Sequence, residues 1–214
     1  MKVRTLEALS SSLDDELAWR IKELHELHAD VRNAASLSKN GRLRAGVALL
    51  YAHWEGFVHN AAHAYLQYVA GRGARLEQLS AGLLALAVRG RLKEFIANND
   101  VEQHIGLVNL FRSRLGEAAK LPTAEVLSTG GNLNSERVRR MTLTLGLDYA
   151  PYELKENLLD AQLLYLRNNI AHGKGLCPTE GEFESLFAEV LGLLRCFKNQ
   201  IENAAALRLY EARP

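Results

Sequence analysis

Apolar residues recur every three or four positions along most of this chain, which is the spacing of one face of an α-helix. Within residues 13–35 that face consists of Leu13, Leu17, Ile21, Leu24, Leu27, Val31 and Ala34. The four prolines stand at positions 122, 151, 178 and 214, between the periodic segments or at the end of the chain. No alternating strand pattern persists. The sequence therefore predicts an all-α protein.

Capping residues predict where the helices begin and end. The expected helices cover residues 13–35, 42–70, 79–96 and 135–146, with others after Asp100, Pro151 and Thr179. Ser11, Asp100 and Ser135 are expected to act as N-caps, and Thr179 with Glu182 forms a capping box. Gly146 is expected to end its helix as a C′ glycine. The helix after Asp100 is expected to pack through Val101, Ile105, Val108, Phe111 and Leu115.

The length of 214 residues fits one domain with a sizeable core. Because the chain has no internal repeat and no low-complexity linker, a single bundle-like domain over residues 1–214 is the economical interpretation. Residues 119–134 are the least regular part, since Pro122 and the "STGGNLN" stretch interrupt the periodicity. We expect these residues to form a loop excursion.

The net charge is only +1, so any nucleic-acid site must be a local cluster of basic residues. Cys177 and Cys196 lack the spacing of a metal finger, and we interpret them as free thiols of a reducing compartment. The N-terminus has no apolar signal region, and no apolar run approaches the length of a membrane span. These features predict a cytoplasmic protein without a membrane segment.

The stretch "YLRNNIAHGKG" (residues 165–175) concentrates polar chemistry at the end of a helix. Arg167 offers a permanent charge and the paired donors that suit a phosphate, and His172 can exchange a proton near neutral pH. Asn168 lies one turn before His172, and Asn169 and Lys174 are assigned supporting roles. This is a minimal kit for metal-free RNA cleavage. From the spacing alone, capping of the helix C-terminus by Arg167 and His172 is the more common explanation.

The helix before His172 carries two apolar stripes when it is drawn as a regular α-helix. Leu159, Leu163, Leu166 and Ile170 form the first stripe, which is expected to enter the core. Leu158, Ala161 and Tyr165 begin the second, which becomes polar at Asn168 and His172. A helix that is apolar on two sides usually contacts a second partner in addition to its own core.

Three segments of the chain resemble the HEPN superfamily. "RNNIAHG" is similar to its motif, in which arginine and a polar residue are followed by three residues and a histidine. The segments 49–69 ("LLYAHWEGFVHNAAHAYLQYV") and 130–148 ("GGNLNSERVRRMTLTLGLD") resemble two others of a bacterial branch of HEPN-like nucleases. Together the three segments span most of the chain in the expected order.

The resemblance implies a HEPN-like helical bundle with extra helices and with the motif near the end of a late helix. It implies a metal-independent endoribonuclease without a cofactor, used as a toxin or in defence against phage, in which Arg167, Asn168 and His172 carry the activity. It also implies a homodimer, for which Leu158, Ala161 and Tyr165 would supply the contact. A cognate antitoxin or another defence protein is an expected partner. The superfamily also contains non-catalytic modules that bind RNA or protein, and this alternative stays open.

A second candidate site lies in the segment 49–69. Glu55, His59 and His63 are four residues apart on one helix, a spacing that can hold a metal ion. Alternatively, Glu55 packs beside the motif helix and orients Arg167 or His172. An exposed glutamate that serves neither role explains the spacing equally well.

Overall fold

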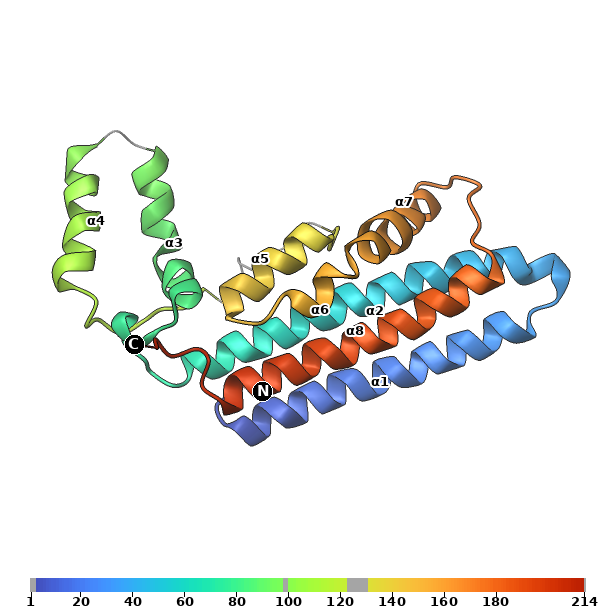
Figure 1. Cartoon of the computed structure of the whole chain (residues 1–214), viewed down its shortest axis with the longest axis horizontal. Helices are drawn as coiled ribbons and strands as arrows, with labels where there is room; N and C mark the ends of the chain where they lie inside the picture. The colour runs from blue at the N-terminus through green and yellow to red at the C-terminus, as the bar shows by residue number, and fades with distance from the viewer. Residues whose placement is uncertain (1–2, 98–99, 123–130, 214) are drawn as a thin grey trace.

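The computed structural model describes residues 3–97, 100–122 and 131–213, which are helical apart from turns, loops and isolated β-bridges (Figure 1). The elements are α1 (Leu6–Asn33), α2 (Ser36–Ala70), η1 (Leu76–Gln78), α3 (Ala81–Ala97), α4 (Val101–Ser113), α5 (Ser135–Leu145), α6 (Ala150–Glu153), η2 (Leu158–Leu164), α7 (Tyr165–Ala171) and α8 (Glu180–Ala206). The all-α prediction is thus confirmed. Among the described helices, none combines the length and apolarity needed to cross a lipid bilayer.

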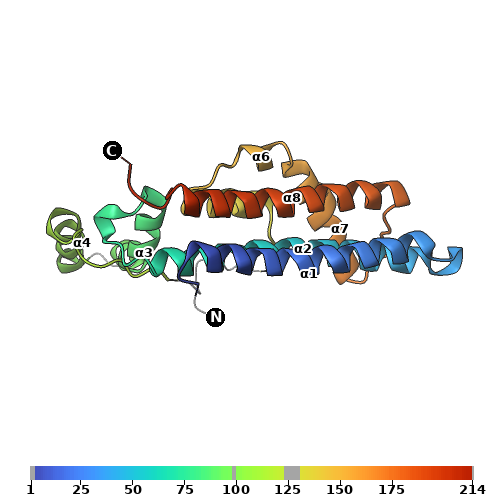
Figure 2. The ribbon, with the colours of Figure 1, turned by 90° about the horizontal axis from the view of Figure 1, so that it is seen from below.

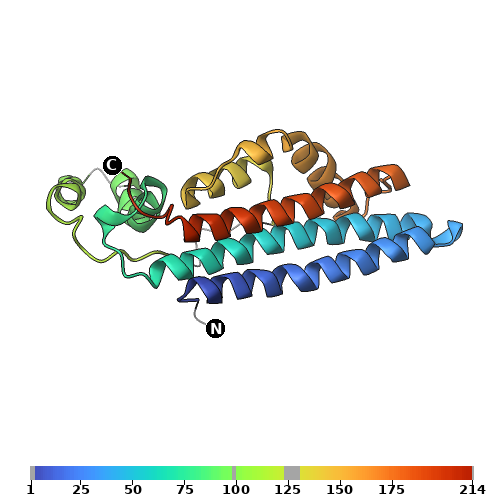
Figure 3. The same cartoon turned by 60° about the horizontal axis from the view of Figure 1, so that its bottom comes forward.

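The long helices α1, α2 and α8 run side by side and form the body of the protein (Figures 2 and 3). Their shared core contains the fully buried side chains of Trp54, Phe57, Phe183 and Phe197. Gly46 of α2 allows a close approach to α8, because a Cβ atom there would lie 2.6 Å from the Phe183 ring. The helices α5, α6 and α7 lie along one side of this body, and α7 packs against α2.

The α3–α4 hairpin leaves the end of the body and projects from it as an arm (Figure 1). Its small separate core contains Leu76, Val88 and Leu110. The C-terminal tail joins the base of the arm, since Ser80 N–H donates to the Tyr210 carbonyl over 2.8 Å and Leu79 bridges to Glu211. The body therefore positions α7, whereas the arm presents α4 at a distance from it.

Several predicted helix boundaries are confirmed. Asp100 caps α4, Thr179 and Glu182 form the capping box of α8, and Gly146 ends α5 with a φ of 72°. Others are wrong. Thr5, not Ser11, caps α1. The break between α1 and α2 covers only the extended residues 34–35, because residues 36–41, predicted to lie between the two helices, are helical. Asn134, not Ser135, caps α5.

Of the apolar face predicted for the helix after Asp100, only Leu115, which lies just beyond α4, packs against the small core of the arm. The side chains of Val101, Ile105, Val108 and Phe111 are 65%, 54%, 49% and 45% exposed. Leu110, on the opposite side of the helix, supplies the buried contact with α3 instead. The 3.6-residue period identifies an apolar stripe, but it does not say whether this chain or another molecule covers it.

The predicted loop excursion at 119–134 is only partly described. Residues 119–122 and 131–134 are not helical, and residues 123–130 lie outside the described ranges. The end of the loop at Leu133 is buried, and its backbone N–H donates to the Tyr51 hydroxyl on α2. The loop thus returns to the body immediately before α5 begins.

Candidate functional site

The helix that carries the motif is wider than a regular α-helix where it begins. Residues Leu158–Leu164 form a π-helical turn, whose hydrogen bonds join residues five apart, before α7 continues from Tyr165. The extra residue in the turn changes the angular position of each side chain. Leu158, predicted to lie on the dimer stripe, is therefore in the core at 9% exposure, whereas Ala161 is exposed and Tyr165 is 55% exposed. Leu159 and Leu163 are buried as predicted.

Asp160 ties the π-turn to the start of α5. Its carboxylate accepts hydrogen bonds from the Ser135 N–H and hydroxyl over 2.7 and 2.5 Å. The loop residues Asn132 and Leu133 are thereby fixed between α2 and α7. This loop was predicted only as an irregular excursion, but it forms one wall of the site.

Arg167 lies in a cluster of polar and aromatic groups from three parts of the chain. Its guanidinium carbon is 4.4 Å from the centre of the Tyr51 ring, a cation–π contact. Its Nη1 donates to Asn132 Oδ1 over 3.0 Å and to Asn168 Oδ1 over 2.7 Å. Its Nη2 is 4.0 Å from Glu55 Oε2, an ion pair without a hydrogen bond. The arginine is thus oriented through Nη1, while Nη2 keeps its N–H groups for a ligand.

Tyr51 and Glu55 of α2 form one side of this cluster. Burial, with the Glu55 carboxylate nearby, raises the pKa of the Tyr51 phenol to about 12, although the Leu133 N–H and the Arg167 charge oppose the shift. The phenol therefore stays neutral under ordinary conditions. Glu55 Oε1 is buried and has no hydrogen-bond partner among the described residues, so it remains a free acceptor beside the arginine.

His172 and Lys174 stand apart from this cluster. The helix ends in a Schellman motif, in which Gly173 N–H donates to the Ile170 carbonyl over 3.0 Å and Lys174 N–H donates to the Asn169 carbonyl over 2.9 Å. Gly173 takes the left-handed φ of 69° that this motif requires. His172, the C-cap, has an exposed side chain with no hydrogen bond or ion pair to a described residue. Its backbone is therefore fixed, while its imidazole faces solvent.

The remaining predicted residues have distinct surroundings. Asn169 is 8% exposed and donates from Nδ2 to the Tyr165 carbonyl over 2.7 Å, so its side chain belongs to the helix rather than to the cluster. The alternative metal site is not formed. Throughout the described ranges, no three His, Cys, Asp or Glu side chains gather closely enough to hold a metal ion.

Sequence reasoning missed two residues of the cluster, Tyr51 and Asn132. Both are distant from Arg167 along the chain, and neither carries a charge. The available signal was their position, because each lies in one of the two other segments that resemble the HEPN superfamily. The structure brings all three segments to one place.

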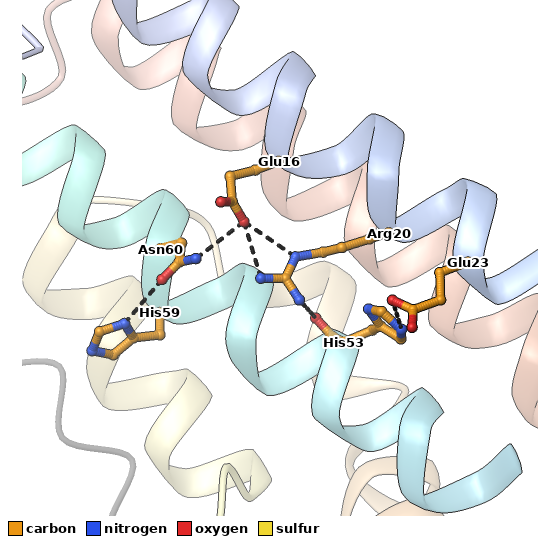
Figure 4. A network of polar contacts seen from close by, with 6 residues as sticks. All are labelled: Glu16, Arg20, Glu23, His53, His59 and Asn60. Carbon is orange, nitrogen blue, oxygen red and sulfur yellow. Dashed lines mark hydrogen bonds and ion pairs between the residues drawn. The ribbon is translucent and has the colours of Figure 1, made fainter. Parts of the chain in front are cut away.

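A second polar network joins α1 to α2 (Figure 4). Arg20, only 6% exposed, donates to Glu16 Oε2 from Nη2 over 3.0 Å and to the His53 carbonyl over 3.5 Å, and Asn60 donates to the same carboxylate over 3.0 Å. The Arg20 guanidinium also lies 4.3 Å from the ring centre of Trp19. This network holds α1 against the helix that supplies Tyr51 and Glu55.

His53 makes the stability of this network depend on pH. Its ring nitrogens have no hydrogen-bond partner in the described ranges, although Nε2 lies 3.3 Å from Glu23 Oε2. Burial lowers the pKa of His53, Glu23 opposes that shift, and Arg20 adds to it. The folded protein therefore binds fewer protons than the unfolded chain, in which a histidine titrates near about 6.5. The contribution of neutral His53 to the free energy of unfolding is therefore complete above about pH 6.5. It is lost as the pH falls towards the lower pKa that His53 has in the folded protein.

We therefore expect the free energy of unfolding to decrease below about pH 6.5, and to decrease less in a His53→Gln variant. Urea unfolding of both chains at about pH 7.5 and 5.5 measures the two differences. Comparing differences removes the fixed cost of replacing a buried side chain. Equal losses in the two chains would show that other groups cause the acid sensitivity.

Fold and site define an all-α protein with a cationic, polar cluster beside the end of a late helix. The HEPN_MAE_28990 model, which describes a HEPN-like family, matches residues 9–210, so the chain belongs to this HEPN family. HEPN domains are commonly metal-independent ribonucleases. Comparison with curated proteins and with solved structures finds no significant match.

Proposed function

We propose that this protein is a metal-independent endoribonuclease that cleaves RNA by attack of a ribose 2′-hydroxyl on the adjacent phosphorus. The observation that carries the proposal is the orientation of Arg167 by Tyr51, Asn132 and Asn168. An arginine that serves only to cap a helix has no need of partners from two other segments of the chain. A guanidinium held in this way meets the charge that develops on the phosphoryl oxygens without further reorganisation.

The proposed roles follow from the chemistry of each group. Arg167 binds the phosphate through Nη2, and Asn168, whose Oδ1 is engaged by the arginine, offers its Nδ2 donors to the same phosphate. His172 exchanges the proton that must leave the 2′-oxygen or reach the departing 5′-oxygen. Lys174 adds positive charge just beyond the end of α7. Glu55 keeps the arginine in place and leaves one carboxylate oxygen as a free acceptor.

The direct test is incubation of the purified protein with structured RNA in EDTA. We expect cleavage to persist in EDTA and to disappear in a His172→Ala variant, whose fold should be unaffected because the side chain is exposed. Gel electrophoresis of end-labelled RNA measures both. Binding of RNA without cleavage by the wild-type chain would support the alternative, a non-catalytic HEPN module.

We further propose that the protein acts as a toxin or an effector of phage defence, controlled by a cognate antitoxin or another defence protein. The support is membership of a HEPN family. Expression in a bacterial host tests this role. Growth arrest by the wild-type chain and normal growth with His172→Ala are the expected results.

A homodimer would bring two copies of the site together. Ala161 and Tyr165 are exposed on the π-turn and on α7, the helix that carries Arg167, and remain available for a two-fold contact. Leu158 is excluded from that contact by its burial. We propose that the dimer forms through this face with help from α2, and that the motif copies share one cleft.

Substituting Ala161 with arginine is therefore expected to split this dimer and to lower RNA cleavage, because a long charged side chain replaces a methyl group at the contact. Light scattering and the cleavage assay measure the two effects. Ala188→Arg on α8 is a matched control, since it makes the same change at another exposed helical alanine. An Ala161→Arg chain with the mass and activity of Ala188→Arg would contradict the proposed contact.

A further inference from the structure

The outer face of α4 is an apolar surface that no described part of the chain covers. Val101, Ile105, Val108 and Phe111 are each between 45% and 65% exposed, and they follow one another along a helix of 13 residues. On the opposite face Leu110 is fully buried against the rest of the arm. Scattered exposed apolar residues are normal in proteins, but a continuous stripe of four large ones marks an interaction surface.

The arm presents this stripe to the surroundings. The α3–α4 hairpin projects from the end of the three-helix body, so another molecule can approach α4 without displacing the body (Figure 1). The stripe also lies on a different element from Ala161 and Tyr165, which belong to the π-turn and α7. A contact at α4 is therefore distinct from the dimer contact proposed beside the motif.

The charges of α4 indicate what binds there. Glu102 is in the first turn and Arg112 in the last turn, and neither forms an ion pair with a residue in the described ranges. Arg112 follows Val108 by four residues and so continues the stripe, whereas Glu102 flanks it beside Val101. An acidic N-terminal end and a basic C-terminal end, joined by an apolar stripe, are complementary to a second copy of the same helix in antiparallel orientation.

We propose that α4 pairs with α4 of a second copy of this chain, antiparallel and about a two-fold axis that passes between Ile105 and Val108. The two-fold operation places Ile105 of each copy against Val108 of the other, and Arg112 of each copy beside Glu102 of the other, so that the charge pair forms twice. Antiparallel helices also bring the positive end of each dipole to the negative end of its partner. A parallel arrangement would instead place like charges together.

Charge reversal on α4 tests the pairing. The host is the chain with Ala161→Arg, which removes the contact proposed at α7, and sedimentation equilibrium over a concentration series measures self-association. We expect Arg112→Glu and Glu102→Arg each to weaken association about tenfold or more, because each creates two like-charge contacts. The double variant, Glu102→Arg with Arg112→Glu, re-forms both pairs in reverse and is expected to return to within about threefold of the host.

Two further variants separate pairing from general surface effects. Ile105→Glu places a carboxylate in the centre of the stripe and is expected to abolish association. Leu37→Glu, at a fully exposed leucine at the start of α2, is expected to leave association unchanged. Circular dichroism of each variant verifies that the helices are retained. The proposal is overturned if the host does not associate, if Ile105→Glu behaves like Leu37→Glu, or if the double variant is as weak as the single ones.

Discussion

Replacing Arg167 with lysine is expected to lower the rate of RNA cleavage by about 10²–10³, the usual effect of removing one oriented donor from a transition state. Lysine keeps the positive charge but lacks the planar guanidinium, so it cannot donate to Asn132 and Asn168 and also direct a second nitrogen at the phosphate. It also loses the flat contact with the Tyr51 ring. Single-turnover cleavage with saturating enzyme measures the change directly.

The matched control is Arg140→Lys on α5. Arg140 is an exposed arginine of α5, a different helix from the one that carries Arg167. Its Nε donates to Glu136 over 2.7 Å. Surface pairs of this kind contribute little, so activity and the denaturation midpoint should stay near those of the wild type. The role assigned to Arg167 is wrong if Arg167→Lys cleaves RNA at a similar rate to Arg140→Lys.

The partners of Arg167 are expected to affect cleavage less than the arginine itself. Asn132→Ala removes one acceptor from Nη1 but leaves Asn168, the Tyr51 ring and Glu55 in place. A loss smaller than that of Arg167→Lys would identify Asn132 as a positioning residue rather than a group that contacts the substrate.

The parts of the fold that were predicted correctly depend on local chemistry. Asp100 caps α4 because its carboxylate reaches a backbone N–H two residues later, and Gly146 ends α5 because it accepts a positive φ. Such features are encoded within a few residues. The start of α1 was missed because Thr5 and Ser11 are both acceptable caps, and only packing selects between them: Leu9, which belongs to the helix only in the longer version, is fully buried.

The errors near the site have a different cause. The stripe containing Leu158 was drawn with about 100° per residue, which holds for an α-helix but not for a π-turn. Widening the turn moves Leu158 into the core and leaves Ala161 and Tyr165 outside. Propensities of single residues do not indicate a π-turn. It is evident here from the backbone of residues 158–164, whose hydrogen bonds join residues five apart.

The motif revealed Arg167 and Asn168, and the second segment revealed Glu55, because charged and amide groups in a tight cluster have a recognisable chemistry. Tyr51 and Asn132 have no such signature. Asn132 is 35 residues from Arg167 along the chain. Tyr51 is 82 residues from Leu133, whose backbone N–H donates a hydrogen bond to the Tyr51 hydroxyl. Contacts at these separations follow from the assembly of α2, α5 and α7, and single-sequence periodicity contains no information about them.

The second large effect concerns the substrate. An RNA with a single 2′-deoxy sugar on the 5′ side of the cut is expected to resist cleavage at that position completely. In the proposed reaction the 2′-oxygen forms a bond to phosphorus, the bond from phosphorus to the 5′-oxygen breaks, and the departing oxygen takes up a proton. His172, the exposed imidazole at the fixed C-cap of α7, is the group assigned to this proton movement. Without the 2′-hydroxyl there is no nucleophile.

The products distinguish this reaction from hydrolysis by water. Attack by the ribose leaves a 2′,3′-cyclic phosphate on one fragment and a 5′-hydroxyl on the other, and mass spectrometry of the fragments identifies both ends. The all-RNA substrate of the same sequence is the control, and a 2′-deoxy sugar placed several residues away from the cut should have little effect. Normal cleavage of the substituted RNA at its deoxy position would mean that water is the nucleophile, and the roles assigned to Arg167 and His172 in ribose attack would then be wrong even if the protein remained a ribonuclease.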